Sequence, residues 1–283
     1  MTISEGPGLF SSTDPAVLMR DFLAGLKMPF SLERSAKCRP GRWSRQRVLF
    51  SAAVEAFGPK RLRRELPLLL ASLGMSKADA GNFLAGATLP GGEPAHYLHL
   101  GVEDGRAKVY WEASRPARLA EGERFVLYRA WKWQAGEPAA VSDYVLVPSA
   151  GEARQAIQAL LADMPMALAD LLEQLEVSFA LNQTPWPPLT VRIEERRGER
   201  QTPRHSLNLH LYGGRLPLGT IAGLMMGLKR EWNSAPRQAT EDWVAAHGGE
   251  VLSNLSFGIG DDGKPFLTCY HGTRLCRPLP SEE

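Results

Sequence analysis

The spacing of apolar residues along the chain changes at Pro94. Before Pro94 they recur every three or four positions, which is the period of an amphipathic helix. After Pro94 they alternate with polar residues, which is the period of a strand with one buried face. The first part therefore predicts helices over residues 14–27, 44–57 and 60–73, a short strand over residues 30–37 and a short helix after Ser76.

The second part of the chain predicts strands that mostly form hairpins. Asp104-Gly105 separates two alternating runs, and Asp-Gly in that position is a strong hairpin signal. The predicted strands cover residues 96–102, 106–111, 124–133, 141–147, 177–181, 189–194, 206–212, 252–259 and 266–271, and helices cover residues 149–173, 218–233 and 240–247. With residues 30–37 the pattern gives about ten strands.

Each predicted strand has one aliphatic face and one polar or aromatic face. The aliphatic face holds Leu98, Leu100, Val102, Ala107, Val109, Trp111, Leu189, Val191, Ile193, Leu207, Leu209, Leu211, Leu255, Phe257 and Ile259. The other face holds Tyr97, His99, Arg106, Lys108, Tyr110, Tyr128, Lys132, Ser142, Tyr144, Ser178, Asn182, Thr190, Arg192, Glu194, Asn208, His210, Tyr212, Ser256, Phe266, Thr268 and Tyr270. All six tyrosines of the chain lie on this second face.

Tyrosines concentrated on one face are poorly suited to bulk solvent and well suited to a partly wet interior. Closing an antiparallel sheet removes its edges, and about ten strands leave room for a ligand. The prediction is an α+β fold: a ten-stranded antiparallel β-barrel with a solvent-accessible lumen, surrounded by α-helices in repeated αββα units. Residues 1–12 are expected to be a flexible segment, residues 13–275 a single barrel and residues 276–283 a tail.

The predicted lumen combines cations with phenols. Arg106, Lys108 and Tyr110 point the same way on one strand, and neighbours in this row are about 7 Å apart. Lys132 and Arg192 add positive charge from other strands. Clustered cations with few carboxylates favour an anion with several oxygens, such as a diphosphate. Tyrosine faces can stabilise a carbocation and shield it from water, so the lining suits ionisation of an allylic diphosphate.

Three segments resemble a known family. They are residues 30–37 with the following 47–57, residues 83–86 leading into 99–102 and 106–110, and residues 256–259 leading to Tyr270. With the order of elements they resemble the ABBA (αββα) prenyltransferases over most of the chain, and most closely the cyanobactin-type peptide prenyltransferases. The resemblance implies the ten-stranded barrel of that family, known as the PT barrel.

The resemblance also implies roles for individual residues. Glu33 would be the catalytic base that takes the proton of the acceptor. The isoprenyl diphosphate and its cation would be held and shielded by Arg106, Lys108, Tyr110, Lys132, Arg192, Asn208, His210, Tyr212, Thr268 and Tyr270. On these later strands the family often has cations followed by a tyrosine. This chain keeps the tyrosines, Tyr212 and Tyr270, but has Asn208, His210 and Thr268 where the family often has cations. Tyr97, His99, Tyr128 and Tyr144 would line the acceptor pocket.

The implied function is transfer of a C5 or C10 group, dimethylallyl or geranyl, from its diphosphate to an electron-rich side chain of a cyclic ribosomal peptide. The alternatives are a small aromatic acceptor, or a non-catalytic barrel that binds an anionic ligand or a peptide. The chain has no aspartate-rich NDxxD motif, so Mg²⁺ would at most help to neutralise the diphosphate. The pairs His96/His99 and His205/His210 lack a third ligand at suitable spacing, and no metal site is predicted.

Charge and cysteine content narrow the cellular setting. Lys+Arg number 33 and Asp+Glu 31, a balance that argues against a surface built for nucleic acid. The basic run from Lys37 to Arg64 keeps nucleic acid, or an acidic leader peptide, as an alternative partner. An odd number of cysteines, three, and the lack of a signal peptide or apolar span predict a cytoplasmic protein without a membrane partner. A monomer or weak homodimer is expected.

Overall fold

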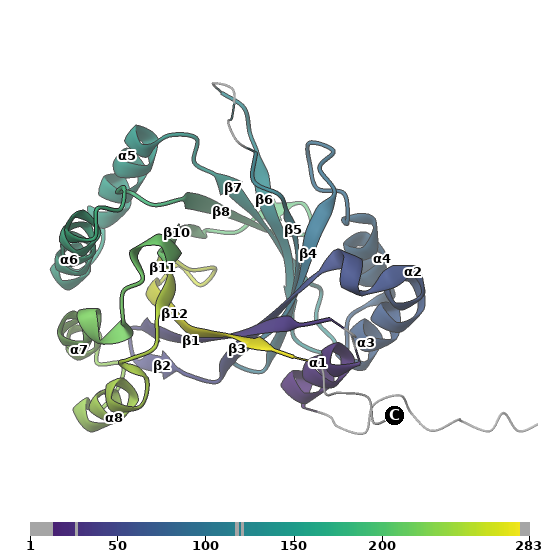
Figure 1. Ribbon diagram of the computed structural model, residues 1–283, viewed down its shortest axis with the longest axis horizontal. Coiled ribbons are helices and arrows are strands. Elements are labelled where there is room, and N and C mark those ends of the chain that lie inside the picture. The colour runs from purple at the N-terminus through teal and green to yellow at the C-terminus, as the bar shows by residue number, and fades with distance from the viewer. Residues whose placement is uncertain (1–13, 26–27, 117–118, 120–121, 278–283) are drawn as a thin grey trace, which may run out of the picture.

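The protein is a closed antiparallel barrel with helices on its outside (Figure 1). The computed structural model describes residues 14–25, 28–116, 119 and 122–277. The barrel strands are β1 (Phe30–Arg39), β3 (Arg47–Ala53), β4 (Ala95–Glu103), β5 (Arg106–Ala113), β6 (Val126–Trp133), β7 (Ala140–Leu146), β8 (Thr190–Arg197), β10 (His205–His210), β11 (Leu252–Ile259) and β12 (Pro265–Cys276). Each pairs with the next in this order, and β12 pairs with β1 to close the ring. The ten-stranded barrel predicted from the alternation is confirmed.

Two short strands extend the sheet and eight α-helices surround it in the described residues. β2 (Arg42–Ser44) pairs with β1, and β9 (Arg200–Gln201) pairs with β8. The helices are α1 (Pro15–Ala24), α2 (Gly58–Lys60), α3 (Leu66–Ser72), α4 (Lys77–Ala85), α5 (Ala150–Leu161), α6 (Met166–Leu181), α7 (Ala222–Glu231) and α8 (Arg237–His247). Asp14, Ser76 and Ser149 cap α1, α4 and α5, since each side chain accepts a bond from a first-turn N–H group.

The hydrophobic core lies between the outer face of the barrel and the helices. Leu207 and Leu209 of β10 pack in one cluster with residues of α6 and α7, and Trp111 of β5 packs in another with α1, α3 and α4. The Trp111 ring stacks on Phe83 at 4.7 Å, and its N–H donates to the Phe83 carbonyl at 2.7 Å. Because the outer face is buried in this way, the polar strand face is left for the interior.

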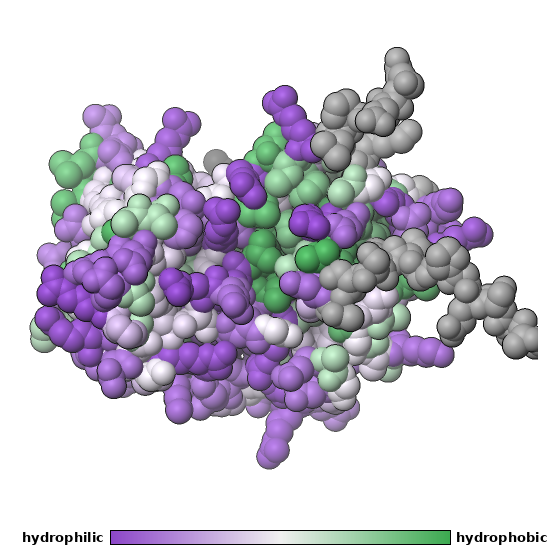
Figure 2. All heavy atoms as spheres, turned by 90° about the horizontal axis from the view of Figure 1, so that it is seen from below, coloured by the Kyte–Doolittle hydropathy of each residue, from purple (hydrophilic) through white to green (hydrophobic). Residues whose placement is uncertain are grey.

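The face of the molecule seen from below is mostly polar on its helical side (Figure 2). Figure 2 views the molecule from below, where the helical side at the left is mostly hydrophilic and apolar residues gather near the middle. No described helix is both long and apolar enough to span a bilayer.

Two predicted elements are wrong. Residues 44–57, predicted as a helix, form the end of β2, strand β3 and a 3-10 turn (Val54–Ala56). The apolar spacing there fits both periods, and pairing of β3 with β1 and β4 decides in favour of a strand. Residues 177–181, predicted as a strand, are the last turns of α6, so Ser178 and Asn182 are not in the sheet. The predicted helix over 149–173 is also divided, into α5 and α6.

The orientation predicted for β8 is also wrong. Ile193 pairs with Tyr144 and Glu195 pairs with Ser142, so these two β8 residues share the inward face. Arg192 points outward, and its side chain is 52% exposed beside Glu194. Period-two alternation defines two faces of a strand, but only pairing with neighbours determines which face is internal.

Gly258 in β11 is essential for close packing against β10. Its φ of +138° is a conformation that L side chains rarely adopt, and an added Cβ would overlap the carbonyl oxygen of His205. We expect Gly258→Ala to lower the free energy of unfolding by about 3 kcal/mol, measured by urea denaturation. Gly81→Ala in the exposed face of α4 is the control and should stabilise by up to about 1 kcal/mol. Equal midpoints for the two variants would contradict the packing argument.

Candidate active site

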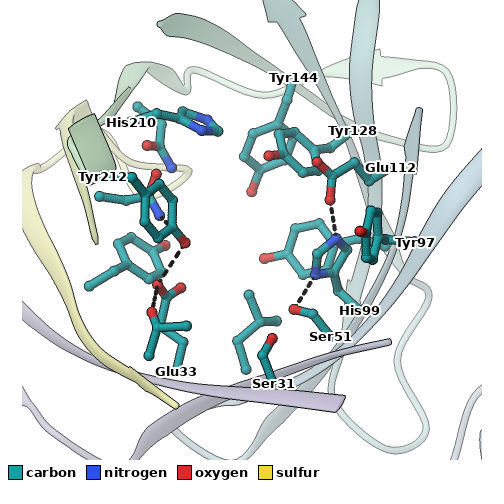
Figure 3. Close-up of a pocket in the computed structure, with 16 residues that line it drawn as sticks. Ser31, Glu33, Ser51, Tyr97, His99, Glu112, Tyr128, Tyr144, His210 and Tyr212 are labelled. Carbon is teal, nitrogen blue, oxygen red and sulfur yellow. Dashed lines mark hydrogen bonds and ion pairs between the residues drawn. The ribbon is translucent and has the colours of Figure 1, made fainter. Parts of the chain in front are cut away.

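The barrel encloses a cavity of about 320 Å³ that all six tyrosines line. They come from five strands and the turn after β10: Tyr97, Tyr110, Tyr128, Tyr144, Tyr212 and Tyr270. Tyr97 and Tyr212 are 46% and 48% exposed and form the mouth, whereas Tyr110 and Tyr144 are buried deeper. Figure 3 shows these side chains converging on one space from opposite walls.

The aromatic rings pack against one another around this space. Tyr144 meets Tyr110 and Tyr128 edge to face, with ring centres 5.8 and 5.6 Å apart. His210 stacks on Tyr128 at 6.0 Å. Burial raises the pKa of Tyr110, Tyr128 and Tyr270 above the ordinary value, so these phenols remain neutral at physiological pH. The lining therefore offers ring surfaces and uncharged hydroxyls.

A layer of charged side chains closes the barrel beneath the tyrosines. The Lys108 Nζ atom lies 5.1 Å from the centre of the Tyr110 ring, and it also pairs with Glu103 at 3.0 Å. Glu103 also binds Arg47 at 2.6 Å and Lys37 at 3.6 Å. A second carboxylate, Glu195, lies 3.2 Å from Arg204 and 3.8 Å from Lys132. We call these seven residues the charged layer.

The charged layer holds five cations and only two carboxylates. Burial, together with the like charges of Arg47, Arg204 and Lys132, outweighs Glu103 and lowers the pKa of Lys37 to about 7. Burial also lowers the pKa of Lys132. Glu103, in contrast, keeps its charge. Burial disfavours that charge, but Arg47 and the lysines together outweigh burial and hold the pKa of Glu103 well below the ordinary range. Asp104 lies 3.9 Å from Arg47, and Lys132, Arg204 and Lys37 help to lower the pKa of Asp261, so two more carboxylates border the layer. The layer is thus desolvated and still has more basic groups than carboxylates around it, and a bound anion would stabilise the charged form of Lys37 and Lys132.

Glu33 lies in the upper part of the cavity, where two β-bulges meet. In one bulge, two residues of β12, Gly272 and Thr273, lie opposite the single residue Glu33 of β1. In the other, Ser253 of β11 has no partner residue on β12. Bulges re-aim side chains, and here Thr273 and Ser253 both donate to Glu33 Oε1. Tyr212 donates to the same oxygen at 3.2 Å. Burial raises the pKa of the Glu33 carboxyl, an effect that the three hydroxyls oppose only in part.

A second polar group faces Glu33 across the cavity (Figure 3). His99 Nδ1 lies 2.6 Å from Ser51 Oγ, and His99 Nε2 lies 2.7 Å from Glu112 Oε2. The three side chains come from β3, β4 and β5, which are adjacent in the barrel. The cavity therefore has a carboxyl group on one wall and an imidazole with its own carboxylate partner on the opposite wall.

The structure places the predicted residues in several different environments. The cavity brings together Glu33, Tyr97, His99, Tyr110, Tyr128, Tyr144, Asn208, His210, Tyr212 and Tyr270. Lys108, Lys132 and Thr268 lie beneath them and do not line it. Arg106 is at the outer end of the barrel, 40% exposed and 4.0 Å from Asp261. Arg192 is outside the barrel, so the prediction that it points into the lumen is wrong.

Sequence reasoning missed several residues of the site. Arg47 and Ser51 were hidden because their strand was predicted as a helix. Glu103 and Glu112 continue inward rows that the alternation already defined on β4 and β5, so extending those rows would have found them, whereas no inward row was predicted for residues 30–37, where Lys37 lies two positions after Ser35 and four after Glu33. Arg204 precedes β10, where strand periodicity gives no signal.

Comparisons with known proteins agree on the fold. No protein-family model and no curated protein matches the chain. A 6-dimethylallyl tryptophan synthase has a TM-score of 0.56 at 14% identity, covering 88% of this chain and 83% of that chain. The prenyltransferase PriB, in a ternary complex with L-tryptophan and dimethylallyl thiolodiphosphate, has a TM-score of 0.55 at 12% identity, covering 85% of this chain and 79% of that chain.

A 5-dimethylallyltryptophan synthase from Streptomyces coelicolor gives a TM-score of 0.53 at 13% identity, covering 85% of this chain and 80% of that chain. Such low identity establishes a shared barrel fold and nothing finer. These matches do not confirm the particular similarity to cyanobactin-type enzymes that the sequence suggested.

Proposed function

We propose that the protein is a prenyltransferase that moves an isoprenyl group from an allylic diphosphate to an aromatic acceptor. One observation carries the proposal: a cavity lined by six tyrosines lies directly above a desolvated layer that is rich in basic side chains. An allylic diphosphate has the complementary halves, since one end is a polyanion and the other becomes a carbocation.

The donor would lie across the boundary between the two regions. No residue of the charged layer lines the cavity itself, so the diphosphate would have to pass between the tyrosines to reach Lys108 and the other cations, with Glu103 and Glu195 keeping those cations in place. The C1–O bond breaks and its electron pair leaves with the diphosphate, whose growing charge the cations stabilise. The allylic cation is left against Tyr110, Tyr144 and Tyr270, which exclude water.

The acceptor would occupy the wide upper part of the cavity, between Glu33 and His99. Its aromatic carbon or heteroatom forms the new bond to the allylic carbon, and a proton is then lost. Glu33, whose pKa is raised by burial, is the proposed proton acceptor. The His99–Glu112 pair on the opposite wall can bind a polar group of the acceptor.

The size of the cavity favours a small donor and a compact acceptor. About 320 Å³ is at the lower limit of ordinary ligand sites, which span roughly 300–1,000 Å³. This favours dimethylallyl over geranyl diphosphate. Of the proteins of similar fold, PriB is described with L-tryptophan, which supports a small aromatic acceptor. The peptide acceptor remains a prediction from sequence, as does any help from Mg²⁺.

The direct test is product formation. The protein is incubated with dimethylallyl diphosphate and, in separate reactions, with L-tryptophan, L-tyrosine, indole and a cyclic peptide that contains both residues. Mass spectrometry should detect one added C5 unit on a small aromatic acceptor, with pyrophosphate released in equal amount. Parallel reactions with EDTA and with Mg²⁺ measure the metal requirement. Saturable binding of the diphosphate without product on any acceptor would instead support the non-catalytic barrel.

The tyrosine shield predicts that the ring matters more than the hydroxyl. Tyr110→Phe keeps the ring face and should retain most of the turnover. Tyr110→Leu fills similar space without a π face and should lower turnover roughly 10–30-fold, as expected for loss of a desolvated cation–π contact of about 2 kcal/mol. It should also increase the fraction of donor lost to dimethylallyl alcohol, measured by chromatography. Equal effects of both variants would contradict the shield.

A further inference from the structure

A cluster of two histidines and a glutamate lies on the outside of the barrel, away from the tyrosine cavity. His247 is the last residue of α8, Glu250 follows in the turn to β11, and His271 is on β12. His271 packs outward against α8, where its ring centre lies 5.4 Å from Trp243, whereas its neighbour Tyr270 faces the lumen. The fold thus brings together residues that are up to 24 positions apart in the sequence, from residue 247 to residue 271.

The donor atoms of the cluster converge. His247 Nδ1 lies 3.1 Å from Glu250 Oε1, and His271 Nδ1 lies 2.7 Å from Glu250 Oε2. One ligand atom from each residue falls within 4.8 Å of the other two. The two imidazole rings have their centres 5.1 Å apart, so both present Nδ1 to the same carboxylate.

We propose that His247, Glu250 and His271 form a binding site for Zn²⁺. Two imidazoles and one carboxylate are a ligand set that Zn²⁺ takes with water in the remaining position, and imidazole selects against Mg²⁺ and Ca²⁺. In such a tetrahedral site, neighbouring ligand atoms lie about 3.3 Å apart for metal–ligand distances near 2.0–2.1 Å. The two contacts to Glu250, at 3.1 and 2.7 Å, would have to widen, and all three ligand atoms already lie within 4.8 Å of one another, so side-chain movements alone would admit the ion.

The surroundings of the cluster fit a metal site. His247 ends α8, where the helix dipole favours positive charge. Arg34 binds Glu250 Oε1 at 3.2 Å, and Trp243 packs on both imidazole rings, so the ligands are held from outside. A hollow of about 330 Å³ borders the two histidines and gives an ion access. Asp242, Arg34 and Arg45 line the same hollow, and Arg34 is paired with Glu250.

A bound ion would fasten the end of α8 to β12. The attachment lies on the wall behind the candidate base, since Arg34 follows Glu33 in β1 and pairs with His271. The inferred role is to hold the bulged region of β1, β11 and β12, and the ion takes no part in the chemistry of the lumen. The inference is therefore independent of the proposed transferase activity.

The test uses untagged full-length protein and no substrate. Titration with Co²⁺ should give visible absorption bands that saturate at one ion per chain, and Zn²⁺ should abolish them while excess Mg²⁺ should not. Zn²⁺ should also raise the thermal midpoint of the protein. His247→Gln is the decisive variant, because His247 is only half-buried and its loss should leave the fold intact while abolishing binding.

His271→Gln tests the second ligand, with circular dichroism to check the fold. His205→Gln, at the exposed start of β10, is the matched control and should bind like the wild type. Failure of the wild type to bind Co²⁺ with one-to-one stoichiometry would overturn the proposal and leave a hydrogen-bonded triad. Binding that persists in His247→Gln would overturn it too.

Discussion

Replacing Lys108 with methionine should reduce turnover by about 10²–10³-fold, the range seen when one preorganised charge-stabilising group is removed. Lys108 is the cation at the boundary between the charged layer and the tyrosines, 5.1 Å from the Tyr110 ring centre. Burial disfavours its charge, but Glu103 together with the neighbouring tyrosines outweighs burial and holds the pKa of Lys108 well above the ordinary value, so the ammonium stays charged. Initial rates of pyrophosphate release, with dimethylallyl diphosphate as the donor, measure the effect.

Arg106→Met is the matched control because Arg106 lies two residues earlier on the same strand and the same face. Its side chain is 40% exposed at the outer end of the barrel, so its loss should change turnover less than about threefold. In the Lys108→Met variant Glu103 still pairs with Arg47 and Lys37, so the barrel should remain folded, which circular dichroism checks. If a folded Lys108→Met variant retained wild-type turnover, the diphosphate site would not be in the charged layer.

Glu33→Gln should lower turnover by about 10²–10⁴-fold, the usual contribution of a general base. The amide is nearly the same size, and its oxygen can still accept bonds from Tyr212, Ser253 and Thr273. Only the capacity to take a proton is lost. Glu112→Gln, on the opposite wall, is the control and should have a smaller effect. A larger loss in Glu112→Gln than in Glu33→Gln would move the base to the His99–Glu112 pair.

The raised pKa of Glu33 also fixes the sign of two pH effects. A base works only when ionised, so turnover of the wild type should fall with acidification at a pH above the ordinary carboxyl value of 4.5. The folded state binds this proton more tightly than the unfolded state, so ionisation of Glu33 at higher pH costs stability. Glu33→Gln should therefore melt at a higher temperature than the wild type at pH 8. At pH 4, where Glu33 is protonated in the wild type, the difference should disappear.

The order of strands and the tyrosine lining could be predicted because both depend on local patterns. Tyr97, Tyr110 and Tyr144 lie on different strands, and within each strand the period of two places the tyrosine on the face opposite to neighbouring residues that pack under helices. The same rule failed for Arg192 because polar residues on β8 lie outside the barrel, where the strand is partly exposed. It failed for Arg47 because a short apolar run satisfies the helical and the strand period equally.

The sequence by itself determined that Lys108 and Tyr110 lie on the same face of their strand, since side-chain direction follows from position along a strand. Only the tertiary structure decided which charges meet. Lys37 and Arg47 reach Glu103 because β1, β3 and β4 pair side by side although they are far apart in sequence, and Arg204 reaches Glu195 because β10 pairs with β8. Likewise the bulges that turn Ser253 and Thr273 toward Glu33 arise from register between strands, and register is a property of pairs of strands that no single segment encodes.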